Sequence, residues 1–296
     1  MKLRRIFALS PDCHVPGSRY SLVWRNHFYD GLRDSGLEVI LPAGINFMSI
    51  PKTIHYCWLS NDPWEDIYKK CFATWATFLP DYKFVLWDLS KPVNSNFFNK
   101  MIRKEKWAFA SDYLRLHALY FHGGIYLDLD IEVVKTFDSL LNHQCFFGRE
   151  DAQKLGCHII GSQKNNTFIK ECLDYYDSSF KLKMSNPPTM PRIVTRLAYK
   201  HGLKNENSIQ TLKNDISIYS SSFFAPLHYS DRFNENPRKF LSQDSYCIHY
   251  WHHGWSWLSS KSILRHISNQ PWLFMNVQDW KRFLKILIQK LLNKSS

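Results

Sequence analysis

Apolar and polar residues alternate along the chain in segments that predict strands and helices in turn. Residues 53–58 (TIHYCW) and 83–87 (KFVLW) read as strands, and a helical pattern over about 65–78 lies between them and stops before Pro80. Strands that alternate with helices favour an open, parallel-type sheet with helices on both faces. The pattern therefore predicts an α/β fold.

The most distinctive pattern is a helix over about 107–121 that leads through a glycine pair into an apolar strand over 125–134. Gly123 and Gly124 are the expected left-handed cap, because glycine adopts positive φ without steric cost. The patterns that follow predict strands over 145–150 and 157–162 and a helix over about 166–180.

Two acids, Asp128 and Asp130, stand within the 125–134 strand. Residues two apart on a strand point to the same face, so both carboxylates could share one cation, and carboxylate oxygens suit Mg²⁺ or Mn²⁺. The alternative is a strand end that faces water. Their place at the carboxyl end of the strand favours a ligand site, because open α/β sheets bind ligands there.

Asp112 and Arg115 are three residues apart on the 107–121 helix. One interpretation is an ordinary surface ion pair. The other is a carboxylate that accepts sugar hydroxyls beside a guanidinium that donates to hydroxyls or phosphate. Because this helix leads directly into the Asp128 strand, the two pairs of residues could converge, which favours function.

Histidine and tryptophan crowd the segment 248–257 (IHYWHHGWSW). A neutral imidazole is a common further ligand for a metal held by carboxylates, and tryptophan offers a stacking face. Core packing is the alternative for this segment. Trp58, at the end of the 53–58 strand, has the same two interpretations: a core aromatic or a platform for a nucleotide base.

Composition narrows the ligand class. The chain has 296 residues, a formal net charge of +12 and 16% aromatic residues, which suits nucleic acid, an anionic membrane surface or nucleotide substrates. Its seven cysteines show no CxxC spacing, which indicates free thiols. The absence of a long apolar run and of a secretory h-region predicts a cytoplasmic location.

Four ordered segments resemble the DXD-containing sugar transferases of glycosyltransferase family 32, the capsular-polysaccharide and α-mannosyltransferase-like group. They are residues 50–58, 79–88, 110–135 and 248–257. The resemblance implies a GT-A fold, a Rossmann-like open mixed sheet flanked by helices. It also implies a retaining hexosyltransferase that uses a UDP- or GDP-linked sugar donor and Mn²⁺ or Mg²⁺.

The resemblance also assigns roles to residues. Trp58 would stack on the donor base, Asp112 and Arg115 would hold the donor sugar, and Trp257 would approach the diphosphate. The implied metal ligands are Asp128, which would also contact ribose, Asp130 and His249. The terminal motif is stretched by Trp255 between Gly254 and Ser256, so His252 or His253 stays open as a substitute for His249.

Three other functions compete with this one. A glycosylating toxin or effector that modifies a host protein would share the same motifs. A haloacid dehalogenase-type phosphatase also uses DxD, but it needs Thr or Val where Glu132 stands. Non-enzymatic nucleic-acid binding rests on the +12 charge alone, and the paired carboxylates would repel phosphate. We therefore expect no nucleic-acid partner.

Three regions follow: an N-terminal extension (1–47) with a β-α-β-like pattern, the transferase domain (48–260) and a C-terminal segment (261–296). Residues 279–296 form one apolar stripe at helical spacing, and lysine and arginine occupy the remaining surface. This composition is typical of an interfacial helix. The segment predicts peripheral attachment to the anionic inner face of the cytoplasmic membrane, where a lipid-linked glycan acceptor for capsule or O-antigen would reside.

Overall fold

The computed structural model describes residues 6–7, 39–40, 49–60, 62–181 and 188–252. In the N-terminal extension, strands β1 (Ile6–Phe7) and β2 (Val39–Ile40) pair in parallel, as a β-α-β unit requires. The helix expected between them lies outside the described residues. So do the expected C-terminal helix, His253 and Trp257.

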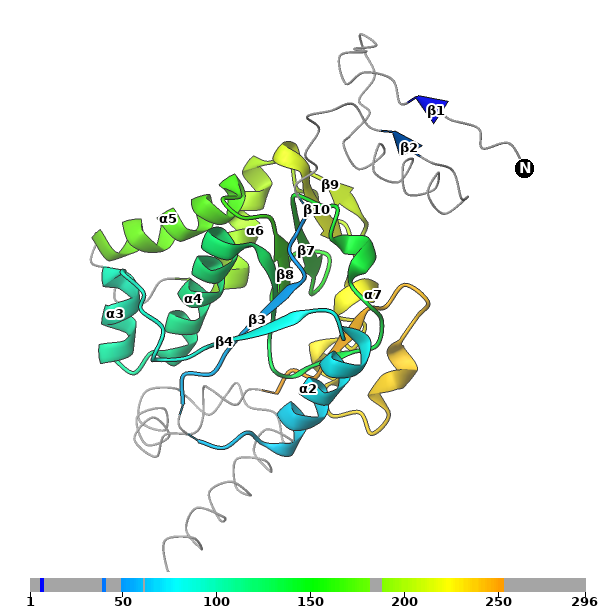
Figure 1. Ribbon diagram of the computed structural model, residues 1–296, viewed down its shortest axis with the longest axis horizontal. Coiled ribbons are helices and arrows are strands. Elements are labelled where there is room, and N and C mark those ends of the chain that lie inside the picture. The colour runs from blue at the N-terminus through cyan, green and yellow to red at the C-terminus, as the bar shows by residue number, and fades with distance from the viewer. Residues whose placement is uncertain (1–5, 8–38, 41–48, 61, 182–187, 253–296) are drawn as a thin grey trace, which may run out of the picture. The chain divides into compact units, whose positions relative to one another are not determined.

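The main sheet has seven strands in the order β4-β3-β5-β8-β7-β10-β9 (Figure 1). The strands are β3 (Thr53–Cys57), β4 (Lys83–Trp87), β5 (Gly124–Leu127), β7 (Cys145–Arg149), β8 (Leu155–Ser162), β9 (Gln210–Thr211) and β10 (Ile216–Tyr219). Strand β8 runs antiparallel to both its neighbours, β5 and β7, while β3 pairs in parallel with β4 and β5. The predicted open mixed sheet is confirmed.

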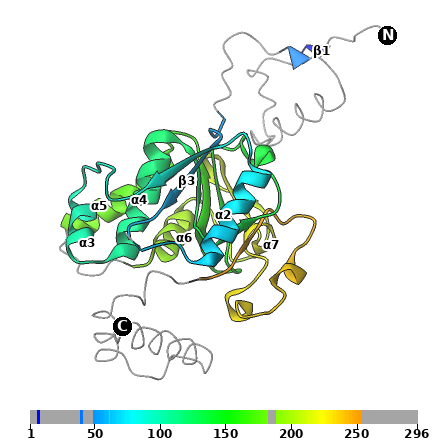
Figure 2. The same ribbon diagram turned by 60° about the horizontal axis from the view of Figure 1, so that its bottom comes forward.

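Helices cover both faces of the sheet (Figures 1 and 2). They are α2 (Asp66–Phe78), α3 (Asn96–Arg103), α4 (Trp107–His122), α5 (Thr167–Lys181), α6 (Met190–Lys200) and α7 (Ser221–Phe224). Side chains of β3 alternate between the faces: the ring of Tyr56 packs on Trp75 of α2, whereas His55 lies near His122 of α4. This alternation is why β3 reads as a nearly continuous apolar run.

Helix α2 is fixed to a second, two-stranded sheet formed by β6 (Ile131–Val133) and β11 (Cys247–His249). The indole Nε1 of Trp75, a fully buried side chain, donates to the carbonyl of Ile131 at 2.8 Å, and the backbone N–H of Val133 donates to Thr74 Oγ1 at 2.9 Å. These bonds satisfy polar groups in an otherwise apolar contact.

The glycine pair turns the chain from α4 into β5. Gly123 has φ +67° and Gly124 has φ +108°, a region that disfavours any side chain. A Cβ on Gly124 would also lie 2.6 Å from the carbonyl oxygen of Thr53. The turn therefore places the end of α4 directly against the start of β5.

Two further expectations concern the described part of the chain. Its six cysteines are free and buried, as predicted. None of its helices combines the length and apolar character that crossing a membrane requires.

Candidate active site

The two acids of the DXD motif lie in a tight turn between strands. The predicted 125–134 strand is wrong in this respect: β5 ends at Leu127 and β6 begins at Ile131. The backbone N–H of Asp128 donates to the carbonyl of His158 at 2.9 Å, and the N–H of Ile131 donates back to the carbonyl of Asp128 at 3.2 Å. The turn leaves both carboxylates at the carboxyl-end edge of the sheet.

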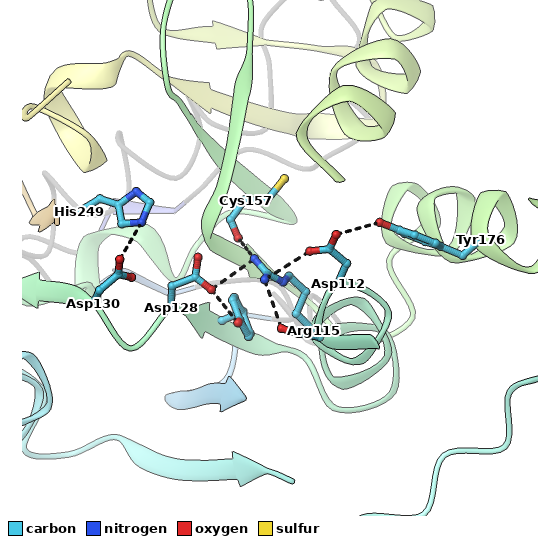
Figure 3. Close-up of polar contacts among 9 residues, drawn as sticks. Asp112, Arg115, Asp128, Asp130, Cys157, Tyr176 and His249 are labelled. Carbon is cyan, nitrogen blue, oxygen red and sulfur yellow. Dashed lines mark hydrogen bonds and ion pairs between the residues drawn. The ribbon is translucent and has the colours of Figure 1, made fainter. Parts of the chain in front are cut away.

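Strand β11 brings His249 to these acids. Its antiparallel register with β6 places His249 opposite Ile131, and Nε2 of His249 lies 3.4 Å from Oδ2 of Asp130 (Figure 3). The same carboxylate oxygen accepts the backbone N–H of His252 at 2.7 Å. The imidazole of His252 instead lies 3.0 Å from a carboxylate oxygen of Glu65. Between His249 and His252, the structure therefore places the imidazole of His249 next to the two acids.

Asp128, Asp130 and His249 form a group that could hold a divalent cation. One ligand atom from each of the three lies within 4.8 Å of the others. Two carboxylates and an imidazole make a mixed oxygen and nitrogen donor set that suits Mn²⁺. The second ring nitrogen of His249, Nδ1, is buried and makes no hydrogen bond to any described residue. The residues present thus fit the cation that the sequence implied.

Burial and neighbouring charges shift the pKa of each member of the group. Although burial opposes its ionisation, His249 and the N–H of His252 hold the pKa of Asp130 below its usual range. Burial likewise opposes protonation of His249, but Asp130 beside it raises the pKa of the imidazole. Burial raises the pKa of Asp128, and Arg115 acts against that rise. Of the two acids, Asp130 is thus the one whose pKa favours the anionic form that binds a cation.

Arg115 is a buried arginine, only 9% exposed, that connects α4 to the DXD turn (Figure 3). Its guanidinium carbon lies 4.4 Å from the centre of the Tyr126 ring. Its polar partners are the carbonyl oxygen of Cys157 at 2.6 Å and, each at 3.4 Å, Oδ1 of Asp128, Oδ1 of Asp112 and Oγ of Ser111. The interpretation of Asp112 and Arg115 as a surface ion pair is wrong, because β8 and Tyr126 cover the guanidinium.

Asp112 joins three helices behind the site. Besides Arg115 of its own helix, its carboxylate accepts a hydrogen bond from the hydroxyl of Tyr176 on α5 at 3.5 Å and one from the backbone N–H of Met190 at the start of α6. Burial raises the pKa of Asp112 to about 6, although Arg115 opposes the rise. Asp112 and Arg115 thus approach Asp128 as the sequence indicated.

Trp58 follows β3 at the same edge of the sheet. It is half-buried, packs edge-on against Trp64 and Tyr68, and donates from Nε1 to the carbonyl of Asp62 at 3.0 Å. An aromatic held in this way has both a supported edge and an accessible part, as a stacking platform needs.

Sequence reasoning missed two residues of the site. His158 of β8 stacks on His249 with ring centres 4.4 Å apart, and the hydroxyl of Tyr126 donates to Oδ1 of Asp128 at 2.8 Å. The alternation of β5 could have revealed Tyr126, which shares a face with Asp128. His158 gave no local signal, because it stands in an apolar strand.

Two family models match the chain. The "Glycosyltransferase sugar-binding region containing DXD motif" matches residues 65–147, and the "Alpha 1,4-glycosyltransferase conserved region" matches residues 161–272. The chain resembles the DXD-motif glycosyltransferases. Its open mixed sheet with a DXD turn at the edge agrees with the GT-A type expected from the sequence.

Curated relatives of the chain include inositol phosphoceramide mannosyltransferase 3 of Schizosaccharomyces pombe, 28% identical over 41% of this chain and 35% of the relative. Glucan organizing enzyme 1 of Cryptococcus neoformans is 28% identical over 68% of this chain and 52% of the relative. The chain thus spans between a third and about half of the length of these two relatives. Among solved structures, PaToxG glycosyltransferase has a TM-score of 0.45 at 24% identity, covering 51% of this chain and 70% of that chain.

Proposed function

We propose that the protein is a metal-dependent, retaining glycosyltransferase. It moves a sugar from a UDP- or GDP-linked donor to a glycan acceptor, and this acceptor is carried on a lipid during synthesis of a surface polysaccharide such as capsule or O-antigen. The observation that carries the proposal is the convergence of Asp128, Asp130 and His249 within 4.8 Å, with the buried Arg115 beside them.

The ligand set supports transfer from a sugar diphosphate. A divalent cation bound there, Mn²⁺ or Mg²⁺, would neutralise charge on the departing diphosphate. Asp130 is held for this task by the N–H of His252 and by β11, and Asp128 is oriented by Tyr126 and Arg115. The two carboxylates are therefore already in position, and the protein need not rearrange them to bind the cation.

The residues around the ligand set support binding of the rest of the donor. Trp58 would stack on the nucleotide base, because it directly follows β3, the strand next to β5, at the same edge of the sheet. Asp112 and Arg115 would hold the sugar by charge-assisted hydrogen bonds. None of the residues named above would act as a covalent nucleophile. Retention of the anomeric configuration then implies that the acceptor hydroxyl attacks the sugar from the same face that the diphosphate leaves.

The relatives suggest where to begin with the donor. One of them is named as a mannosyltransferase, so GDP-mannose is the first donor to test, beside UDP-glucose, UDP-galactose and their N-acetyl derivatives. Release of nucleotide from each donor is measured with Mn²⁺, with Mg²⁺ and in excess EDTA. Metal-dependent hydrolysis of one donor is expected. Full turnover in EDTA, or hydrolysis of none of the donors, would contradict the proposal.

We further propose that residues 279–296 attach the protein to the inner face of the cytoplasmic membrane. The proposal is supported by the amphipathic, lysine-rich sequence, and each basic residue near anionic lipid adds about 1 kcal/mol. Co-sedimentation of the full chain with anionic liposomes is compared with that of a chain ending at Asn276. Salt-sensitive binding by the full chain alone is expected, and equal binding by both would refute the proposal.

A further inference from the structure

A third acid, Glu150, lies at the same edge of the sheet as the DXD turn. It directly follows β7, as Asp128 directly follows β5, and these two strands run in the same direction because each is antiparallel to β8. Only β8 separates them in the sheet. The carboxyl ends of β5 and β7 therefore present Asp128 and Glu150 to the same side of the molecule.

Gly156, at the start of β8, makes room for the Glu150 side chain. A Cβ at this position would lie 3.3 Å from Cγ of Glu150 and 2.4 Å from Cε1 of His158. His158 in turn stacks on His249 at 4.4 Å. Gly156 thus lies against both side chains, and Glu150 and His158 pack on the same glycine.

The carboxylate of Glu150 lies near several charged groups but is not paired with any of them. It makes no hydrogen bond and no ion pair with any residue that the structure describes. Burial raises its pKa, the positive charges of His249 and Lys154 lower it, and the negative charges of Asp151 and Asp128 raise it again. The carboxylate oxygens of Glu150 are not among the fully buried polar atoms, so they are free to accept hydrogen bonds from a group that the substrate brings.

We propose that Glu150 is a further catalytic residue, which contacts the transferred sugar; this inference rests on the proposed glycosyltransferase function. The order of strands supports the assignment. Along the carboxyl-end edge of the sheet, Trp58 follows β3, Asp128 follows the neighbouring strand β5, and Glu150 follows β7. Strand β8 lies between β5 and β7. A donor with its base on Trp58 and its diphosphate at Asp128 has its sugar on the far side, toward β8 and β7.

The chemistry suits a carboxylate at that point. The transferred sugar develops positive charge at its anomeric carbon and ring oxygen as the diphosphate departs. Glu150 would accept hydrogen bonds from the sugar hydroxyls and offset this charge, without forming a bond to the sugar. Because its carboxylate would act most strongly in the transition state, its loss should lower turnover more than donor affinity.

The test compares Glu150→Gln, which keeps the side-chain shape and removes the charge, with Glu105→Gln, an exposed glutamate between α3 and α4. Hydrolysis of the best UDP- or GDP-sugar is measured together with calorimetric binding of the free nucleoside diphosphate and thermal melting. We expect Glu150→Gln to lower kcat about 100-fold while nucleoside diphosphate affinity and Tm stay at the wild-type values.

Three other results would contradict the role of Glu150 or the proposed function. Equal rates for Glu150→Gln and Glu105→Gln, with an active wild type, would overturn the role of Glu150 and leave the proposed function intact. Parallel losses of rate and of nucleoside diphosphate affinity would also overturn it, because the residue would then support the nucleotide part of the site. A wild type that neither hydrolyses any donor nor binds UDP or GDP would overturn both proposals.

Discussion

One guanidinium nitrogen of Arg115 lies 3.4 Å from Oδ1 of Asp128, so the helix that precedes the glycine pair holds the first acid of the DXD turn. A second nitrogen contacts Asp112 at the same distance. The planar fork thus bridges two carboxylates while it donates to the carbonyl of Cys157. An ammonium group on a flexible stem cannot reproduce this geometry.

Arg115→Lys is therefore expected to impair both activity and stability. Turnover should fall sharply, and loss of charge-assisted hydrogen bonds should lower the free energy of unfolding by about 2 kcal/mol. Donor hydrolysis and urea unfolding measure the two effects, with Arg103→Lys, an exposed arginine of α3, as the matched control. Wild-type values in both assays would show that the bridge has no role.

Asp130→Asn tests the cation site with little change of shape. The amide oxygen can still accept the N–H of His252, but the charge that attracts the cation is gone. We expect Mn²⁺ affinity, measured by calorimetry, to fall about 100-fold or more, with donor hydrolysis lost in parallel. Asp81→Asn, an exposed acid before β4, is the control. Undiminished Mn²⁺ binding by Asp130→Asn would exclude Asp130 as a ligand.

Trp58→Ala should weaken binding of the free nucleotide by about 1 to 3 kcal/mol, the loss expected for one base-aromatic stack. Titration calorimetry with UDP and GDP gives the affinity, and thermal melting shows whether the contacts with Trp64 and Tyr68 matter for the fold. A lower Tm at unchanged affinity would make Trp58 a packing residue.

Acid sensitivity is expected from His55, whose ring is fixed in one neutral form. Nδ1 accepts from the indole of Trp87 at 3.0 Å, and Nε2 donates to the carbonyl of Gly123 at 2.8 Å. Burial lowers the pKa of His55 from 6.5 to about 4. Its contribution to stability is therefore present above pH 6.5 and is lost as the pH falls toward 4, because the unfolded chain then binds the extra proton.

The measurement is the free energy of unfolding of the wild type and of His55→Gln at pH 7 and pH 4.5. The stability difference between the two should be smaller at pH 4.5, because at that pH the unfolded wild-type chain binds a proton at His55 that the folded chain does not. His228→Gln, at an exposed imidazole, is the matched control. A difference that does not change with pH would rule out this role for His55.

The sequence predicts local features of this site better than its long-range ones. The α4 helix, the glycine turn and β5 follow from adjacent residues, because capping and alternation are local properties. The sequence pattern predicts strand where the structure has the turn at 128–130, since Leu129 and Ile131 continue the apolar alternation. What ends β5 is a partner change: Leu127 pairs with β8, whereas Ile131 pairs with β11.

The sequence of α4 alone also does not predict that the Arg115 side chain is buried. Spacing alone describes an ion pair with Asp112, and such pairs usually lie at the surface. The carbonyl of Cys157 and the ring of Tyr126 that cover the guanidinium come from two other strands. Glu150 and His158 lie beside the site because β8 runs antiparallel to β7. No local pattern of apolar and polar residues specifies this pairing.

The pairing of β11 with β6 sets an order of events during synthesis of the protein. The two acids emerge from the ribosome well over a hundred residues before His249, so a nascent chain has an incomplete ligand set until β11 has joined β6. Tight cation binding would then favour the conformation in which this late strand is in place. A bound ion would thus stabilise the last step in folding of the newly made protein. A chain that ends before Cys247 would keep the two DXD acids but lose His249, their third partner.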